Sequence, residues 1–590
     1  MARKKRSPAD PEARRVKNLP SGQRTRSSDG ASIVTQNIGA APLLVRILER
    51  MRLEKLLGQY LPDTDQRVKP GTDSVLCLLV LNLLISREPV YGVAEWACQY
   101  PPDLFNLWVQ DLEHLNDDRV GRALDRLFDA LDSGVILAVV QQVIQEFRLE
   151  LDEIHNDSTS VSFFGAYEGA DTEGTMRGKP TPAITWGFSK DHRPDLKQLL
   201  YILTVTDDGG VPIYFQTSSG NTTDDNTHES TWNVMRQLID RPDFVYVADC
   251  KMASTNNMNA IARQGGRFIT VLPATRKECD TFRGQMRAKP DKIKWTQLYQ
   301  VQDDKGEILD TYSACSDDHV SAEGFRIVWI FSTGKKDRDA LARISRTERA
   351  IHALTKLRER LQGPRTRFRD RSKVDEEVQG ILQEFDVADW LTVNVEELEK
   401  EQYKQSDRGR PTKDTKYVRH VETRYTLTWS LDQQQLELAG RADGTFPLIS
   451  NIRDWSERRI LEAYKRQPII EKRFSQFKTD FQVAPVYLKN IGRVVALLAV
   501  YFFALMVQTL FERELRRAMN REGIASIPLY PEGRQCAAPT TRQVIDLFES
   551  VQRHTLRRSN QEDLCLTTDL PPLHRQIVKL MNGSIQQYGL

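Results

Sequence analysis

Between residues 151 and 275 the apolar residues form short strand-like runs, and the order of these runs constrains the fold more than any other feature. Three runs follow one another without a helical segment between them. The second and third are joined at Asp207-Asp208-Gly209-Gly210, residues that accept the backbone angles of a tight turn. A helical segment, a strand, a second helical segment and a further strand follow. The order β-β-β-α-β-α-β predicts an α/β fold, with helices packed on a mixed sheet.

The segments before residue 151 differ in composition and periodicity. Residues 1–33 are polar and basic, which predicts a disordered tail. From 34 to 150 the apolar residues recur at intervals of three and four, which predicts an all-helical N-terminal domain. Asp73 and Ser74 stand where a helix cap is expected. Whether this domain binds DNA or mediates contacts is left open.

The chain after residue 275 is predicted to interrupt the sheet and then return to it. Residues 276–450 carry short strands around a charged helical segment, with Leu341, Ile344, Ile351 and Leu354 at helical spacing. We interpret them as a β-rich insertion. Helical spacing resumes in residues 451–520, the last part of the sheet domain, and residues 521–590 are expected to form a helical tail.

Composition limits the partners and the compartment. The 83 basic and 81 acidic residues give a net charge of +2, so a polyanion must meet local basic patches. The seven cysteines include no C-x-x-C pair, which indicates reduced thiols without a zinc ribbon or a disulfide framework. The longest apolar run, 494–507, is shorter than the roughly 20 residues of a membrane span. A buried helix and a soluble, cytoplasmic protein are therefore expected.

Three acidic residues are the candidate catalytic and metal-binding group. Asp157 follows the first residues of the first strand, Asp249 ends the strand of "FVYVAD", and Glu471 lies on a later helix. If they met at one sheet edge, they could not all stay ionised without a cation, and Mg²⁺ or Mn²⁺ would introduce two-metal phosphoryl chemistry. The alternatives are a helix cap for Asp249, a turn residue for Asp157 and a solvated position for Glu471.

Glu471 belongs to a seven-residue repeat. Tyr464, Glu471 and Lys478 are two helical turns apart, so they share one face of a helix, together with Gln467. Pro468 is expected to kink this helix or to begin a new one, so the shared face is best defined from residue 469 onward.

This order of motifs resembles the DDE transposases of bacterial insertion sequences, in particular the branch that carries a "YREK" signature on an RNase H-like fold. The signature reads Tyr464, Gln467, Glu471, Lys478, with Gln467 in the usual arginine position and Arg466 next to it. Segments 156–165, 187–199 and 219–224 match as well, and the resemblance covers roughly residues 38–515.

The resemblance implies a catalytic domain in which Asp157, Asp249 and Glu471 hold Mg²⁺, for which Mn²⁺ can substitute. Water would cleave one DNA strand, and the freed 3′-hydroxyl would attack a phosphodiester. Tyr464 and Lys478 would hold the terminal phosphates. The implied partners are double-stranded DNA, as terminal inverted repeats and target, and further copies of the chain, as a dimer on DNA. The implied location is the bacterial cytoplasm, at the nucleoid when bound.

Two further segments are candidate DNA contacts. The loop 187–199 offers Lys190, Arg193 and Lys197, and "RGRP" at 408–411 places Arg408 and Arg410 as in a minor-groove hook. The alternative for both segments is an ordinary solvated loop, and for the four residues of "RGRP" this is the favoured interpretation. For the whole chain, the competing functions are a catalytically inactive or domesticated DNA-binding protein that retains the fold, and a nuclease of the junction-resolvase type.

Overall fold

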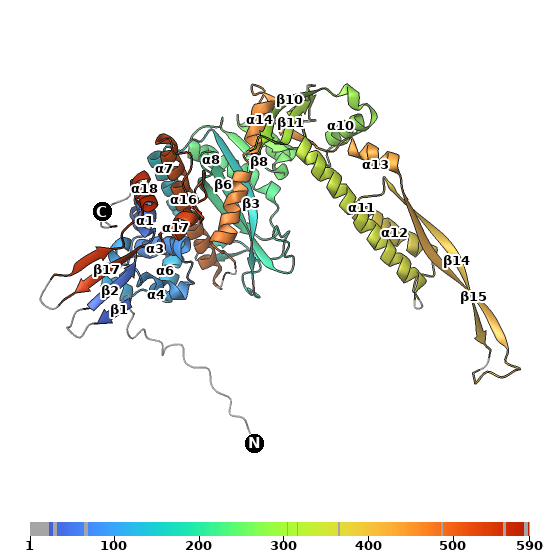
Figure 1. The fold of residues 1–590 in the computed structure, drawn as a ribbon, viewed down its shortest axis with the longest axis horizontal. Helices are drawn as coiled ribbons and strands as arrows, with labels where there is room; N and C mark the ends of the chain where they lie inside the picture. Colours follow the sequence, from blue (N-terminus) through green and yellow to red (C-terminus); the bar gives the residue numbers. More distant parts are fainter. Residues whose placement is uncertain are drawn as a thin grey trace, which may run out of the picture. The chain divides into compact units, whose positions relative to one another are not determined.

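The computed structural model divides the chain into two units. It describes residues 23–26, 32–63, 69–303, 305–315, 317–363, 366–406, 408–484, 486, 488–530, 532–558, 562–582 and 588. Unit 1 comprises residues 1–268 and 463–590, and unit 2 comprises residues 269–462. Figure 1 shows the elements with the labels used below.

The predicted N-terminal helices are present in unit 1. They are α1 (Ala41–Arg50), α2 (Leu53–Tyr60), α3 (Thr72–Ile85), α4 (Val93–Ala97), α5 (Val109–Glu113), α6 (Asp117–Ala130) and α7 (Val135–Phe147). The helix α6 shows why they form: Asn116 accepts a cap bond from the Arg119 amide at 2.8 Å, and Val120, Leu124 and Leu127 are buried on one face. The predicted cap of α3 is wrong, because that helix already begins at Thr72.

A mixed sheet follows, as predicted. Its unit 1 strands are β3 (Glu153–Phe163), β6 (Lys197–Thr206), β7 (Pro212–Ser219) and β8 (Val245–Ala248), with α8 (His228–Ile239), α9 (Thr255–Arg263) and the start of β9 (Arg267–Val271) in the predicted order. β6 is antiparallel to β3 and β7, whereas β8 is parallel to β3. The turn between β6 and β7 is the predicted one, and Gly209 and Gly210 have φ values of 83° and 62°. A short hairpin, β4 (Gly174–Met176) and β5 (Lys179–Thr181), was not predicted.

The longest helix of unit 1, α16 (Ile491–Arg521), forms its core and packs against α3, α6 and β7. By length and composition alone it could cross a membrane, and two bent pairs, 72–85 with 90–97 and 117–133 with 135–147, pass the same test. The apolar window of α16 is 94% buried inside the protein. The predicted buried helix is confirmed, although it is longer than the 494–507 run.

A second, smaller sheet joins distant parts of unit 1. It contains the strands β1 (Gln23–Arg26), β2 (Ser32–Asn37), β17 (Gln552–Arg557) and β18 (Leu564–Thr567), which pair in that order. Along the chain, β17 and β18 lie between the helices α17 (Thr541–Phe548) and α18 (Pro572–Leu580). The predictions of an all-helical N-terminal domain and a helical C-terminal tail are therefore wrong for these strands. Most of the predicted tail 1–33 lies outside the described residues.

Unit 2 contains an antiparallel sheet and a long hairpin. Its strands β10 (Trp295–Gln302), β11 (Ile308–Cys315), β13 (Arg326–Ser332), β16 (Thr445–Ser450) and β9 lie in that order, and β12 (His319–Val320) pairs with β13. The remaining elements are α10 (Lys277–Ala288), α11 (Thr333–Gln362), α12 (Arg371–Glu384), the hairpin β14 (Leu391–Gln405) and β15 (Tyr417–Leu431), and α13 (Gln433–Gly440).

The charged helical segment predicted in the insertion is α11, but only part of its apolar face is covered. Leu354 is fully buried in a cluster with side chains of α12 and β15. Figure 1 shows α12 beside α11. Leu341 and Ile344 remain 66% and 54% exposed. The cluster starts at Ala350, so helical spacing alone overestimated the length of the buried face.

Candidate active site

Two of the three candidate acids lie side by side on neighbouring parallel strands. Asn156 of β3 pairs in register with Ala248 of β8, so Asp157 and Asp249 follow in step. Since neighbouring strands are about 4.8 Å apart and side chains alternate, both acids start from the same face of the sheet. The strand order predicted from the sequence is what brings them together.

Asp249 also acts as a helix cap. Its Oδ1 accepts a hydrogen bond of 3.0 Å from the Lys251 amide, at the start of a 3₁₀ helix over Cys250–Ala253. The longer helix α9 has its own cap, Ser254, whose Oγ accepts from the Asn257 amide at 3.2 Å. The cap alternative and the metal-ligand prediction are therefore compatible, because a carboxylate keeps a second oxygen.

The third acid, Glu471, stands on α15 (Pro468–Ser475), which packs against β3. Gln467 ties the start of this helix to the strand: its Oε1 lies 2.9 Å from His155 Nδ1, and its Nε2 donates to the Asn156 carbonyl at 3.2 Å. The Glu471 side chain is exposed. Gln467 therefore fixes the helix to β3 one residue before Asp157, and Glu471 follows about one turn later.

The predicted single helical stripe is divided into three pieces. Tyr464 is near the end of α14 (Glu457–Lys465), Glu471 is in α15, and Lys478 is in a π-helical turn over Gln476–Asp480. Pro468 begins α15, as one of the two predicted outcomes required.

Tyr464 connects the three acids electrostatically. Burial, and then the charges of neighbours that include Asp249, Glu471 and Asp157, raise the pKa of its phenol to about 12. The phenol is therefore protonated at neutral pH and is a hydrogen-bond donor. The acids nevertheless do not form a closed cluster, because among the described residues the group with ligand atoms within 4.8 Å of one another lies elsewhere, in unit 2.

Lys190 supplies a positive charge to this group of acids. Its Nζ lies 3.3 Å from Asp157 Oδ1 and 3.0 Å from Asp224 Oδ2. It also donates to the Ser158 carbonyl and hydroxyl oxygens at 2.8 and 2.7 Å. Sequence reasoning expected Lys190 to contact DNA and missed Asp224 as a fourth acid, although Asp224 ends the motif at 219–224.

The raised pKa values of Asp157 and Asp249 show that Lys190 does not fully balance the charge of the acids. Burial raises the pKa of Asp157, an effect that the Lys190 ammonium opposes. Burial, and then the charge of Asp157, raises the pKa of Asp249 to about 6. Carboxylate oxygens are the ligands that Mg²⁺ and Mn²⁺ prefer, and a divalent cation would offset this repulsion. The donor set therefore fits such an ion.

His228 is a neighbour that sequence reasoning did not identify. Its Nε2 lies 3.9 Å from Asp249 Oδ1, and its Nδ1 lies 3.1 Å from the Tyr246 hydroxyl. Burial lowers the pKa of His228 to about 4, so the ring is neutral at neutral pH and forms no ion pair with Asp249. The sequence offered no clear signal for it, because burial is not visible in a sequence and "NTHES" has no distinctive spacing.

Several predicted DNA contacts are engaged within the protein. Arg466 forms a two-pronged ion pair with Glu153, one bond being Nε to Oε1 at 2.7 Å. Gln467 is buried, as described above. Lys197 is also buried, donates to the Ala166 carbonyl and lies 4.9 Å from the Trp186 ring centroid. We therefore leave Gln467 and Lys197 out of the proposed DNA-contacting surface.

The other predicted contacts lie at or near the surface. Lys478 pairs with Asp191. Arg193 is exposed and makes two bonds to Asp195, at 2.9 and 2.7 Å. Arg408 and Arg410 are exposed in the connection between β14 and β15. All are accessible to a polyanion, although Lys478 and Arg193 already form ion pairs with Asp191 and Asp195.

Comparison with known protein families is consistent with this arrangement. A family model described as "Transposase DDE domain" matches residues 154–507, a segment that contains Asp157, Asp249 and Glu471. The chain belongs to the DDE transposase family. A second model, "Domain of unknown function (DUF4277)", matches residues 33–141 of the transposase, the part that holds β2 and most of the N-terminal helices.

Comparisons with individual proteins add little to this assignment. One solved structure found is a piggyBac transposase synaptic complex with hairpin DNA, 8% identical, covering 90% of this transposase and 82% of that chain, with a TM-score of 0.35. At that level the likeness supports no conclusion about the transposase. Among curated proteins, none matches it.

Proposed function

We propose that this transposase cleaves the ends of an insertion sequence and joins them to target DNA by cut-and-paste transposition, and that it belongs to the "YREK" branch. The observation that carries the proposal is the parallel register of β3 and β8, which brings Asp157 next to Asp249. Glu471 lies on α15, which packs against β3 and is tied to the Asn156 carbonyl by Gln467.

Asp157, Asp249 and Glu471 would hold Mg²⁺, with Mn²⁺ as a substitute. When bound, such ions activate the attacking oxygen and stabilise the leaving one. Lys190 bridges Asp157 and Asp224 and partly neutralises both, because its Nζ contacts both carboxylates. Asp224 is available as a further carboxylate for the same group.

The residues around the acids would position the phosphodiester. The Tyr464 phenol, with its pKa of about 12, donates a hydrogen bond to a phosphate oxygen and does not act as a base. Lys478 and Arg193 contribute positive charge to the DNA backbone, and Arg466 supplies the arginine of the signature from the adjacent position. The His228 ring is neutral at neutral pH and therefore adds no positive charge beside Asp249.

The proposed partner is double-stranded DNA, both the terminal repeats and the target. Arg408 and Arg410, exposed at the end of the β14–β15 hairpin, would contact phosphates or a narrow minor groove. Joining two ends requires two protomers, so we propose a dimer on DNA. The site of action is then the bacterial nucleoid, in the cytoplasm.

The test is cleavage of supercoiled plasmid that carries the genomic sequences flanking the gene, with Mg²⁺ or Mn²⁺. Asp249→Asn removes one ligand charge and should slow cleavage at least about 100-fold, since each tenfold corresponds to about 1.4 kcal/mol. Asp152→Asn is the matched control, because the Asp152 side chain is 86% exposed and pairs only with surface arginine Arg241 among the contacts described. It should cleave like the parent.

Two results would count against this proposal. Equal cleavage by Asp249→Asn and the parent would remove the metal-ligand assignment. A parent protein that binds the flanking DNA but leaves it intact with either ion would favour the alternative function, a catalytically inactive DNA-binding protein on the same fold.

A further inference from the structure

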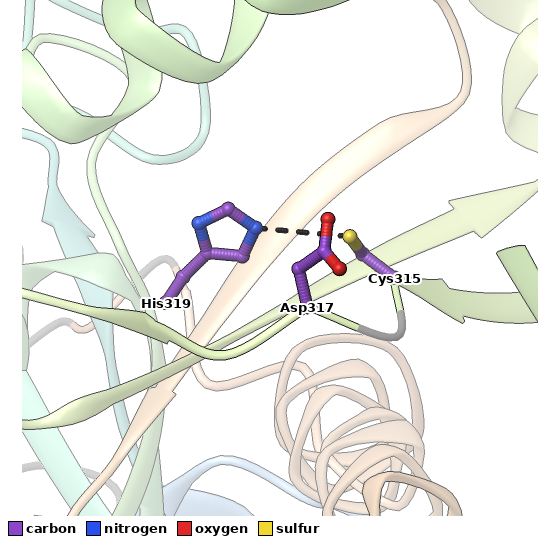
Figure 2. Close-up of side chains that lie close together, drawn as sticks. All are labelled: Cys315, Asp317 and His319. Atoms are coloured by element: carbon purple, nitrogen blue, oxygen red, sulfur yellow. Dashed lines mark hydrogen bonds between the residues drawn. The ribbon is translucent and has the colours of Figure 1, made fainter. Parts of the chain in front are cut away.

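A second cluster of metal-ligating side chains lies in unit 2. Cys315 is the last residue of β11, His319 is the first residue of β12, and Asp317 lies in the bend between them. Figure 2 shows the three side chains pointing toward one another. Their ligand atoms all lie within 4.8 Å of one another, the one such His/Cys/Asp/Glu group among the described residues.

The distance between the sulfur and the imidazole nitrogen matches that of two ligands on one ion. Cys315 Sγ and His319 Nε2 are 3.7 Å apart. Zinc–sulfur bonds of about 2.3 Å and zinc–nitrogen bonds of about 2.05 Å at a tetrahedral angle require a separation of about 3.6 Å. Asp317 is exposed, so its carboxylate can rotate to complete the set.

Packing holds the other two ligands in place. Cys315 is only 6% exposed and pairs with Trp295 across the β10–β11 ladder. The His319 ring stands edge-on to Phe282, with 5.4 Å between centroids and 90° between planes. Phe282 in turn stacks on Trp329 at 3.9 Å. A site whose ligands are fixed before binding loses little entropy when an ion enters.

Burial favours the neutral form of both the imidazole and the thiol. Burial lowers the pKa of His319, so its ring is neutral and has a lone pair available at neutral pH. Burial raises the pKa of the Cys315 thiol, the backbone amide of Asp317 lowers it, and the Asp317 charge raises it again. The charges of Asp317 and Asp318 act on His319 in the opposite sense to burial. A cation among these groups would stabilise the thiolate.

We propose that Cys315, Asp317 and His319 bind Zn²⁺, with a water in the fourth position. A thiolate, an imidazole and one carboxylate suit zinc, whereas Mg²⁺ prefers oxygen ligands alone. The ion would cross-link the end of β11 to the start of β12. The site is independent of the proposed DNA chemistry, because its ligands include none of the residues assigned to that chemistry.

Zinc retention by the full chain tests the proposal. The parent, Cys315→Ser, His319→Gln and Cys565→Ser are loaded with ZnSO₄, dialysed against a weak chelator and assayed for zinc by mass spectrometry. Cys565 is the matched control, since it is an exposed thiol in unit 1. The parent and Cys565→Ser should keep about one ion per chain. Both site variants should bind more than about 100-fold more weakly, beyond the 10–100-fold that loss of an outer-shell partner costs.

Cobalt and thermal measurements identify the ligands and exclude misfolding. Co²⁺ bound to the parent should show a thiolate-to-metal charge-transfer band that Cys315→Ser lacks. Zn²⁺ should raise the Tm of the parent, whereas metal-free variants should melt like the metal-free parent. If a core variant does not fold, Asp317→Asn replaces it, because that side chain is exposed, and it should weaken binding about 10-fold or more.

Three results would overturn the assignment. The parent could retain no zinc after dialysis. The site variants, including Asp317→Asn, could bind zinc as tightly as the parent. Asp249→Asn, which alters only the candidate active site in unit 1, could abolish zinc retention, and this would place the ion at the acids.

Discussion

Replacing Arg473 by methionine should destabilise unit 1 more than any surface change. Arg473 is 1% exposed, and its Nη1 lies 3.1 Å from an oxygen of Glu512, which is fully buried on α16. The same guanidinium donates to the carbonyls of Gly209 and Gly210, in the turn between β6 and β7. One side chain thus joins α15, which carries Glu471, to the sheet and to the core helix.

The expected loss follows from these contacts. Removing one partner of a buried ion pair costs about 3–5 kcal/mol, and here Arg516, which also lies 3.3 Å from Glu512, offsets part of that loss. Two carbonyls also lose a donor, and each unsatisfied buried group costs about 1–3 kcal/mol. The lower ends of these ranges sum to about 5 kcal/mol, and because Arg516 still pairs with Glu512 we expect Arg473→Met to lower the free energy of unfolding by about this amount. The exposed pair of Arg575 with Asp569, side chains 51% and 88% exposed, provides the control Arg575→Met, with a loss of about 0.5 kcal/mol or less.

Pulse proteolysis in urea, with fragments of residues 1–268 followed by mass spectrometry, measures this loss for unit 1 specifically. A double-mutant cycle with Glu512→Gln should show a coupling of about 2–3 kcal/mol, because each single variant already removes the Arg473–Glu512 ion pair that the double variant removes. A loss below about 1 kcal/mol for Arg473→Met, or strictly additive effects, would refute the reasoning.

Three further predictions concern single contacts. Burial, and then the charge of Glu153, raises the pKa of Asp207 to about 6, so the protonated carboxyl stabilises the fold at low pH and this contribution is lost as the pH rises through about 6. Asp207→Asn should therefore raise the Tm at pH 7.5 and leave it unchanged below pH about 4, as thermal melts would show. Gln467→Leu leaves two buried partners in β3 unsatisfied, at about 1–3 kcal/mol each, and an unchanged urea midpoint would contradict this. Replacing Arg408 and Arg410 together by alanine should reduce the slope of log Kd against log salt for DNA by about 2, and an equal slope would exclude both as phosphate contacts.

The central sheet could be predicted because its signals are local. The turn at Gly209 and Gly210 needs residues that accept positive φ, and those residues stand between two alternating runs. Asp157 and Asp249 could be brought together for the same reason, since strand order fixes which strand ends are neighbours. The helix break at Pro468 could also be predicted, because proline lacks the backbone N–H that a continuing helix requires.

Other parts depend on contacts that no local pattern reveals. The segment 552–557, "QRHTLR", does not alternate between apolar and polar residues, and it becomes a strand because 32–37 lies beside it. Gln467 resembles a surface residue in the sequence, yet it is buried because His155 and Asn156 offer it partners. Leu341 has the spacing of a core residue, but α12 and β15 begin to cover the helix only further along.

The pairing of β2 with β17 has a consequence for synthesis on the ribosome. Thr35 and His554 are hydrogen-bonded at 3.0 Å, although 519 positions separate them along the chain. While the chain emerges, the edge of β2 that pairs with β17 stays unpaired until translation has passed Arg557. An unpaired strand edge is prone to join other chains. Products that stop short of that point would carry an open strand edge close to the N-terminal helices, so this small sheet forms only after translation has passed Arg557.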